Sequence, residues 1–165
     1  MLSESNVTPF GPERDQLFMR QALACARRAF AYDEVPIGAV IVDATGSVIG
    51  RGYNRVEKRK CQIAHAEAVA IERATQKRAD WRLDGCWIYV TLEPCSMCMS
   101  LIQLSRCVGM VYGAKSPLFG YRLDNTPGSP VYKRDAFTIV GGIQGEHSAH
   151  LLQTFFQRKR KEKSG

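Results

Sequence analysis

The sequence predicts an α/β fold, a three-layer α/β/α arrangement around a mixed five-stranded sheet. Five segments rich in β-branched and aromatic residues are separated by segments whose apolar side chains recur at helical spacing. In the second half of the chain these strands and helices alternate, which is typical of parallel crossovers with helices on both faces of a sheet. With 165 residues, 45% of them hydrophobic, the chain can form the core of one domain.

The first half of the chain predicts one helix and one hairpin. Residues 13–30 place Met19 and Leu23 on one apolar helical face, and the remaining surface of that helix is largely basic. The β-rich segments 37–42 and 47–53 are separated only by the short sequence DATG, so we expect them to pair as an antiparallel hairpin. This hairpin beside the parallel crossovers gives the mixed sheet.

The second half supplies the alternating elements. They are a helix at 64–79, a strand at 86–92, a helix at 93–105, strands at 107–113 and 136–142, and a final helix from about Glu146. The stretch 114–135 is rich in Pro and Gly without a sustained period, which predicts a loop or a short irregular helix. We therefore expect a single domain at 13–157, between a flexible N-terminus at 1–12 and a basic C-terminal tail at 158–165.

The charge of the chain favours a polyanionic partner. Its net charge is +7 and its pI is about 9.3. Basic residues concentrate at Arg27 and Arg28, at 55–60 (RVEKRK) and at 158–163 (RKRKEK). Clustered Lys and Arg gain affinity for phosphates by releasing counterions, so nucleic acid is the expected partner. A soluble basic surface without a partner is the alternative.

The six cysteines are expected to be reduced thiols, some of them metal ligands. The first dozen residues do not resemble a secretion signal, because they have neither a basic start nor an apolar stretch. No apolar run approaches membrane-spanning length. We therefore expect a cytoplasmic protein.

Two short motifs, thirty residues apart, predict a metal site. His65 and Glu67 lie at the start of one predicted helix, where both side chains can reach a point beyond the helix end. Cys95 and Cys98 lie on the first turn of the next helix, which Pro94 begins. Their spacing puts both sulfurs on one face, and the positive helix end favours thiolates. Cys-x-x-Cys alone also serves structural zinc, redox pairs and helix packing, but the two motifs together indicate a shared ion.

One nitrogen and two sulfur ligands leave a tetrahedral zinc ion with one open position, which distinguishes catalytic from structural sites. Water bound there becomes hydroxide near neutral pH, and Glu67 would relay protons beside it. An alternative is that Cys61, four residues before His65, is a fourth ligand and closes a structural site. That alternative leaves Glu67 without a role.

These residues resemble the zinc-dependent deaminase superfamily, whose signature matches HAE at 65–67 and PCSMC at 94–98. The sequences EVPIGAVIV, GYNR, AHAE, YVTLEPCSMC and FFQRKR are similar to the bacterial tRNA adenosine deaminases. The similarity covers nearly the whole chain from about residue 13. It implies a cytidine deaminase-like fold, with residues 13–157 as the deaminase domain.

The resemblance also implies an activity. It is hydrolytic deamination of adenosine to inosine at the wobble position of a tRNA anticodon, by zinc-activated hydroxide attacking carbon 6 of adenine. The implied site residues are His65, Cys95 and Cys98 for one zinc ion per subunit, Glu67 for proton transfer, Asn54 and Ala66 for the nucleoside, and Phe156, Lys159 and Arg160 for RNA. The implied partners are the anticodon arm of tRNA, usually an arginine tRNA, and a second subunit in a homodimer.

The chain departs from the family pattern beside the site. It carries Cys61, Gln62 and Ile63 where members commonly have Asp-Pro-Thr, and Ser116 where they have an acidic residue. These departures keep open a deaminase of a free nucleobase or nucleoside, of the guanine or cytosine type. A zinc-stapled RNA-binding module without catalysis is a third hypothesis. The basic charge favours the tRNA enzyme over the free-base enzyme.

Overall fold

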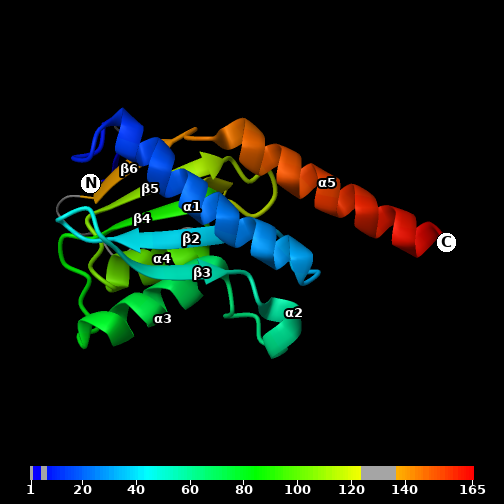
Figure 1. The fold of residues 1–165 in the computed structure, drawn as a ribbon, viewed down its shortest axis with the longest axis horizontal. Helices are drawn as coiled ribbons and strands as arrows, with labels where there is room; N and C mark the ends of the chain where they lie inside the picture. The colour runs from blue at the N-terminus through cyan, green and yellow to red at the C-terminus, as the bar shows by residue number, and fades with distance from the viewer. Residues whose placement is uncertain (1, 5–6, 124–136) are drawn as a thin grey trace.

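The structure, a computed structural model, describes residues 2–4, 7–123 and 137–165. It contains a twisted sheet between two layers of helices (Figure 1). The strands are β1 (Leu2–Glu4), β2 (Gly38–Val42), β3 (Val48–Tyr53), β4 (Trp87–Leu92), β5 (Gly109–Ala114) and β6 (Phe137–Gly141). The helices are α1 (Pro12–Ala31), α2 (Val56–Arg59), α3 (Ala66–Arg78), α4 (Ser96–Leu104), α5 (Gly145–Ser164) and the short 3-10 helix η1 (Tyr121–Leu123).

The sheet has the predicted mixed topology. Its strand order is β1-β6-β5-β4-β2-β3. The hairpin strands β2 and β3 are antiparallel, and β2 is also antiparallel to β4. The β4, β5 and β6 strands run parallel, and α4 forms the crossover between β4 and β5. All five expected strands are therefore present, and the α/β class is confirmed.

The N-terminal end of the chain differs from the expectation. Residues Leu2–Glu4 form a sixth strand, parallel to β6, where we expected a flexible N-terminus and five strands. Three residues are too few to show a periodic pattern, and the pairing depends on backbone groups at the sheet edge. At the other end, α5 continues to Ser164, so the basic tail is helical. Arg158 and Lys159 both pair with Glu162 one turn later, which supports that helix.

The loop or short irregular helix expected at 114–135 can be compared with the structure only at residues 114–123. A 3-10 helix, Tyr121–Leu123, follows β5, while residues 124–136 lie outside the described residues. The one-turn helix α2 lies within the basic run 55–60 and has no apolar period that could have predicted it. Among the described residues, no helix combines the length and apolar character needed to cross a membrane.

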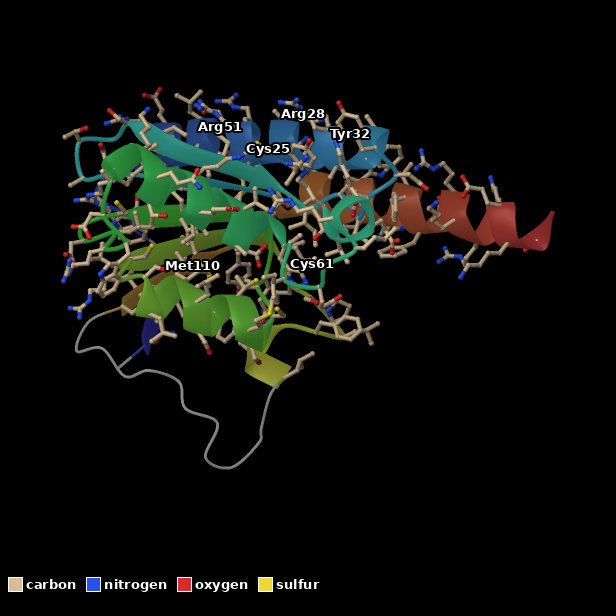
Figure 2. All side chains as sticks on the ribbon, turned by 90° about the horizontal axis from the view of Figure 1, so that it is seen from below. Cys25, Arg28, Tyr32, Arg51, Cys61 and Met110 are labelled. Atoms are coloured by element: carbon tan, nitrogen blue, oxygen red, sulfur yellow. The ribbon has the colours of Figure 1, made fainter. Side chains whose placement is uncertain are left out.

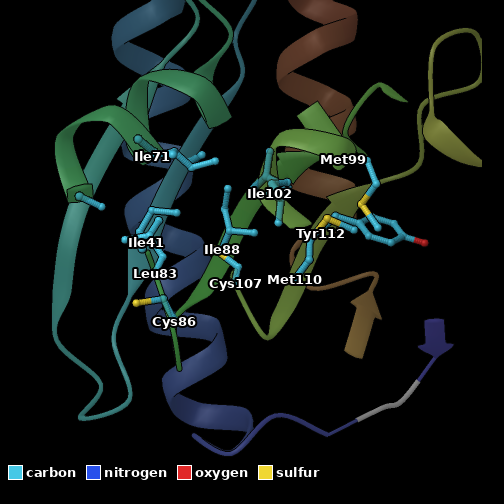
Figure 3. Packing of buried hydrophobic residues seen from close by; sticks show 14 of the residues in the cluster. Ile41, Ile71, Leu83, Cys86, Ile88, Met99, Ile102, Cys107, Met110 and Tyr112 are labelled. Atoms are coloured by element: carbon cyan, nitrogen blue, oxygen red, sulfur yellow. The ribbon is translucent and has the colours of Figure 1, made fainter. Parts of the chain in front are cut away.

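Two apolar cores fill the spaces between the layers. The helices α1 and α5 cover one face of the sheet, and α3 and α4 cover the other (Figure 1). Figure 3 shows the core on the α3 and α4 side, to which sheet and helices both contribute. Its larger members include Ile41, Leu83, Ile88, Ile102, Met110, Tyr112 and Phe137. The strands β2 and β4 are buried on both faces, which explains their continuous apolar runs.

Glycines let α3 lie very close to the sheet. A Cβ atom at Gly52 would come within 2.4 Å of the carbonyl oxygen of Ala66, and one at Gly50 would come within 2.4 Å of that of Ala70. Any larger residue at either position would push the helix away from β3. The lack of a side chain at Gly52 therefore sets where the first turn of α3 lies, and the lack of one at Gly50 sets where the following turns lie.

Candidate active site

The candidate site lies where α3 and α4 begin. His65 is the N-cap of α3 and Cys95 is the N-cap of α4, and both have extended backbone conformations. Their carbonyl oxygens accept the first helical bonds, from the N–H of Val69 at 3.0 Å and of Met99 at 2.9 Å. Neither side chain caps its own helix, so the imidazole and the thiol are both available to a ligand.

The two helix openings bring His65, Cys95 and Cys98 together as predicted. The Nδ1 atom of His65 lies 3.7 Å from the Sγ atom of Cys95 and 3.4 Å from that of Cys98. Zn–S bonds of about 2.3 Å and Zn–N bonds of about 2.0 Å at a tetrahedral centre separate nitrogen from sulfur by about 3.5 Å. The three donor atoms therefore fit one zinc ion.

Within residues 2–4, 7–123 and 137–165, this triad is the single group of three or more His, Cys, Asp or Glu donors close enough to share a metal. All its donor atoms lie within 4.8 Å of one another. Cys61 is not a member of the group. The triad thus has three protein donors, the number found in catalytic zinc sites.

The electrostatics of the triad favour a bound cation. A hydrogen bond from the Cys98 thiol, together with His65, lowers the pKa of Cys95 to about 4. The same contact with the Cys95 thiolate, with burial, raises the pKa of Cys98. The two cysteines therefore share one proton, which a metal ion would replace. The Cys95 thiolate is also the main cause that raises the pKa of His65.

Glu67 lies on the first turn of α3 and is buried. Its exposed fraction is 4%, and burial raises the pKa of its carboxyl group above the usual range. A hydrogen bond with the Cys98 side chain opposes that shift and places the carboxyl group beside the triad. A buried carboxyl group with a raised pKa, placed beside metal-ligating side chains, is typical of a general acid and base.

Asn54 and Ala66, the residues expected to contact the nucleoside, are both buried. Asn54 follows β3, is 6% exposed, and donates its backbone N–H to the carbonyl oxygen of Ile37 at 3.1 Å. Ala66 is fully buried as the first residue of α3. The backbone N–H of Arg55 donates to the carbonyl oxygen of Ala64 at 2.9 Å, which ties the end of β3 to the residues before the triad.

The residues expected to contact RNA lie on α5, outside the donor group. Phe156 is 44% exposed and Arg160 is exposed. Lys159 forms ion pairs with Asp33 and Glu162. Because α5 packs on the opposite face of the sheet from α3 and α4 and projects beyond the body (Figure 1), these side chains are separate from the triad.

Sequence reasoning missed Glu93, which organises the loop beside the triad. Its carboxylate is fully buried, and it accepts hydrogen bonds from the backbone N–H of Ser116 and from the guanidinium of Arg122. The hydroxyl oxygen of Ser116 accepts a bond from the N–H of Phe119. The sequence gives one indication of this role, because Glu93 is an acidic residue between a predicted buried strand and Pro94.

A second missed neighbour is Gln62. Its amide nitrogen lies 3.4 Å from Nε2 of His65, the ring nitrogen that faces away from the thiols. In the opposite amide orientation the Gln62 oxygen would accept a hydrogen bond from Nε2–H and hold Nδ1 free of a proton. This residue stands at one of the positions where the chain departs from the family pattern.

A mixed sheet with a His-Cys-Cys triad and a buried glutamate at paired helix starts defines a zinc-dependent deaminase. The chain belongs to the family described as the cytidine and deoxycytidylate deaminase zinc-binding region, which matches residues 12–114. The resemblance expected from the two motifs is therefore confirmed.

Among individual proteins, the chain is similar to tRNA-specific adenosine deaminases and, at lower identity, to a guanine deaminase. The chain is 39% identical to a tRNA-specific adenosine deaminase of Bacillus subtilis, covering 91% of this chain and 93% of the relative. It is 36% identical to a tRNA-specific adenosine deaminase of Haemophilus influenzae, covering 92% and 88%. A solved structure from a study of A-to-I editing at the wobble position of transfer RNA is 38% identical, with a TM-score of 0.74 over 82% of this chain and 99% of that chain. A guanine deaminase from Nitrosomonas europaea is 26% identical, with a TM-score of 0.74 over 90% and 93%.

Proposed function

We infer that this chain deaminates adenosine to inosine at the wobble position of a tRNA anticodon. The observation that carries this inference is the triad with Glu67 beside it, in a chain that matches tRNA-specific adenosine deaminases over nearly its full length. The free-nucleobase alternative shares the zinc chemistry, and it has support from the guanine deaminase structure at lower identity. The basic charge of the chain favours RNA.

The residues divide the chemistry between them. His65, Cys95 and Cys98 would hold zinc, which, when bound, lowers the pKa of water and so supplies the nucleophile. Glu67 would pass the first proton lost by the water to N1 of adenine, and would then take the proton of the hydroxyl group on carbon 6 and deliver it to the leaving amine. Its position suits this role, because a buried carboxyl group beside the triad can exchange protons with the base at short range. Asn54 and Ala66 orient the base against these groups.

Finer features of the proposal come from the resemblance to the family. We propose one zinc ion per subunit, because the described residues of each chain supply one donor group. We also propose a homodimer and the anticodon arm of an arginine tRNA as substrate, with Phe156, Lys159 and Arg160 on the RNA side. A tRNA substrate is consistent with the expected cytoplasmic location.

The test compares RNA and free-base substrates in one assay. Purified zinc-loaded protein is incubated with an anticodon stem-loop containing adenosine at the wobble position, and inosine is measured after nuclease digestion. Parallel reactions measure ammonia release from free guanine, adenine and cytidine. The proposal predicts inosine in the RNA and no ammonia from the free bases. Activity on a free base without inosine in the RNA would instead assign the chain to the free-nucleobase class.

A further inference from the structure

A stacked pair of tyrosines lies at the C-terminal end of α1. The rings of Tyr32 and Tyr53 are nearly parallel, with an interplanar angle of 13° and centroids 6.1 Å apart. Tyr53 is buried as the last residue of β3, whereas Tyr32 is 55% exposed. The inner ring therefore fixes the orientation of the outer ring, which presents a rigid aromatic surface to solvent. Figure 2 shows Tyr32 beside Arg28 along the outer side of α1.

Three cations surround this pair. The guanidinium groups of Arg28 and Arg55 both lie 5.5 Å from the centroid of the Tyr53 ring, and the ammonium of Lys58 lies 5.2 Å from that of Tyr32. Within the described part of the chain, none of the three forms an ion pair with a carboxylate. Their charged groups are therefore not engaged in close ion pairs with the described residues.

Unlike these three cations, Arg158 and Lys159 on α5 form ion pairs with carboxylates. Arg158 and Lys159 both pair with Asp33, and both also pair with Glu162. A phosphate approaching Lys159 would have to compete with two carboxylates, but one approaching Arg28 or Lys58 would not. The cations on α1 and α2 are therefore more available to a phosphate than Lys159 is.

The fold holds this surface rigidly at the ends of α1 and β3. The buried carboxylate of Glu34 accepts hydrogen bonds from the backbone N–H groups of Glu57 at 3.2 Å and Lys58 at 2.6 Å, which fixes α2 against the end of α1. Tyr53 directly precedes Asn54, the residue proposed to contact the nucleoside. Tyr53 packs with α1 on the other face of the sheet from α3 and α4, so an RNA strand that reaches Asn54 would pass this surface around the end of β3.

We propose that Tyr32, Arg28 and Lys58 form a docking surface for unpaired RNA beside the target nucleotide. A neighbouring base stacks against Tyr32, and its flanking phosphates bind Arg28 and Lys58. Exposed aromatic rings interleaved with cations are the arrangement that binds single-stranded nucleic acid, because every base offers a π-face and every linkage a charge. This inference rests on the proposed RNA substrate and names where that RNA binds.

The test measures binding separately from catalysis. Fluorescence anisotropy gives the Kd of zinc-loaded protein for the anticodon stem-loop over a range of salt concentrations. We expect Tyr32→Ala to raise Kd about tenfold with an unchanged salt slope, and Tyr32→Phe to bind like the parent chain. Lys58→Ala and Arg28→Ala should each weaken binding and reduce the salt slope by about 1.

The matched control is Lys77→Ala, which removes an exposed charge from the last turn of α3. It should leave Kd unchanged. Thermal melting of each variant checks the fold, and Tyr32 is exposed enough for its replacement to be tolerated. If Tyr32→Ala binds RNA within about twofold of the parent chain, the docking surface is wrong even where inosine is formed. If RNA binding depends on Tyr32 but no inosine forms, the docking surface stands and the proposed reaction fails.

Discussion

Glu93 and Arg122 form a two-point contact across 29 residues of sequence. Nε and Nη2 of Arg122 each donate to a different carboxylate oxygen of Glu93, both at 3.1 Å. The Glu93 side chain is fully buried, and that of Arg122 is 33% exposed. Because Glu93 immediately precedes Pro94 and Cys95, this contact fastens the loop after β5 to the start of α4.

Replacing Arg122 by Ala should therefore destabilise the protein. The Glu93 carboxylate would remain buried without its cation, and breaking a fully buried pair costs about 3–5 kcal/mol. Partial exposure of Arg122 lets water replace some of the contact, so we expect about 2 kcal/mol, measured by urea unfolding.

The double variant Glu93→Gln with Arg122→Ala separates charge from packing. Removing the buried charge as well should recover part of the lost free energy of unfolding, as a double-mutant cycle would show. If the double variant loses as much free energy of unfolding as the two single variants together, the two side chains do not interact in solution.

Cysteine replacement tests the ligand set. Cys98→Ala removes one of three donors, so zinc content should fall from near one ion per chain to a small fraction after dialysis, and inosine formation should be lost. Cys25→Ala is the matched control, because Cys25 is a buried cysteine on α1 outside the triad. Metal analysis by mass spectrometry provides the measurement. Full occupancy in Cys98→Ala would require a different donor.

Glu67→Gln tests the proton transfer. Glutamine keeps the shape of the side chain but cannot carry the proton, so kcat should fall by about 10² to 10⁴. Zinc content and the Kd for the RNA stem-loop should stay near those of the parent chain, since neither the triad nor the RNA surface is altered. Near-normal turnover in this variant would remove Glu67 from the mechanism.

The sequence predicted the triad and the positions of five strands along the chain because both are local signals. His65, Cys95 and Cys98 stand at helix starts, which Pro94 and the apolar periods indicate directly. The contacts of Glu93 and Lys159 could not be predicted, because their partners Arg122 and Asp33 are distant in sequence and follow no period. The strand β1 was missed for the same reason, since its pairing with β6 is set by backbone groups.

The pH dependence of stability gives a further test of Glu67. Burial raises the pKa of its carboxyl group in the metal-free fold, so the folded chain holds this proton more tightly than the unfolded chain. Ionised Glu67 therefore costs stability as pH rises above its unfolded pKa of about 4.3. Metal-free Glu67→Gln should have a higher Tm than the metal-free parent at neutral pH, and the difference should shrink as pH falls towards 4. An equal Tm at neutral pH would show that the carboxylate is well solvated.

Gly52→Ala should damage the metal site without touching a ligand. The new Cβ atom would lie 2.4 Å from the carbonyl oxygen of Ala66 and 2.5 Å from the nitrogen of Ala70, so the first turn of α3 must move. Overpacking of this kind costs about 1–3 kcal/mol. Because that turn carries Glu67 and follows His65, zinc affinity and kcat should fall together with stability.

Gly50→Ala is the matched control for this displacement. Its Cβ atom would meet the carbonyl oxygen of Ala70 at 2.4 Å and the side chain of Ala74 at 2.8 Å, one turn further along α3. We expect a similar loss in the free energy of unfolding but a smaller loss of zinc affinity, measured by competition with a chelator. Because both substitutions press on the same helix, a difference between them in zinc affinity can only come from which turn is displaced. Equal losses of zinc affinity would mean that α3 moves as a rigid body and that the glycines set its distance from the sheet as a whole.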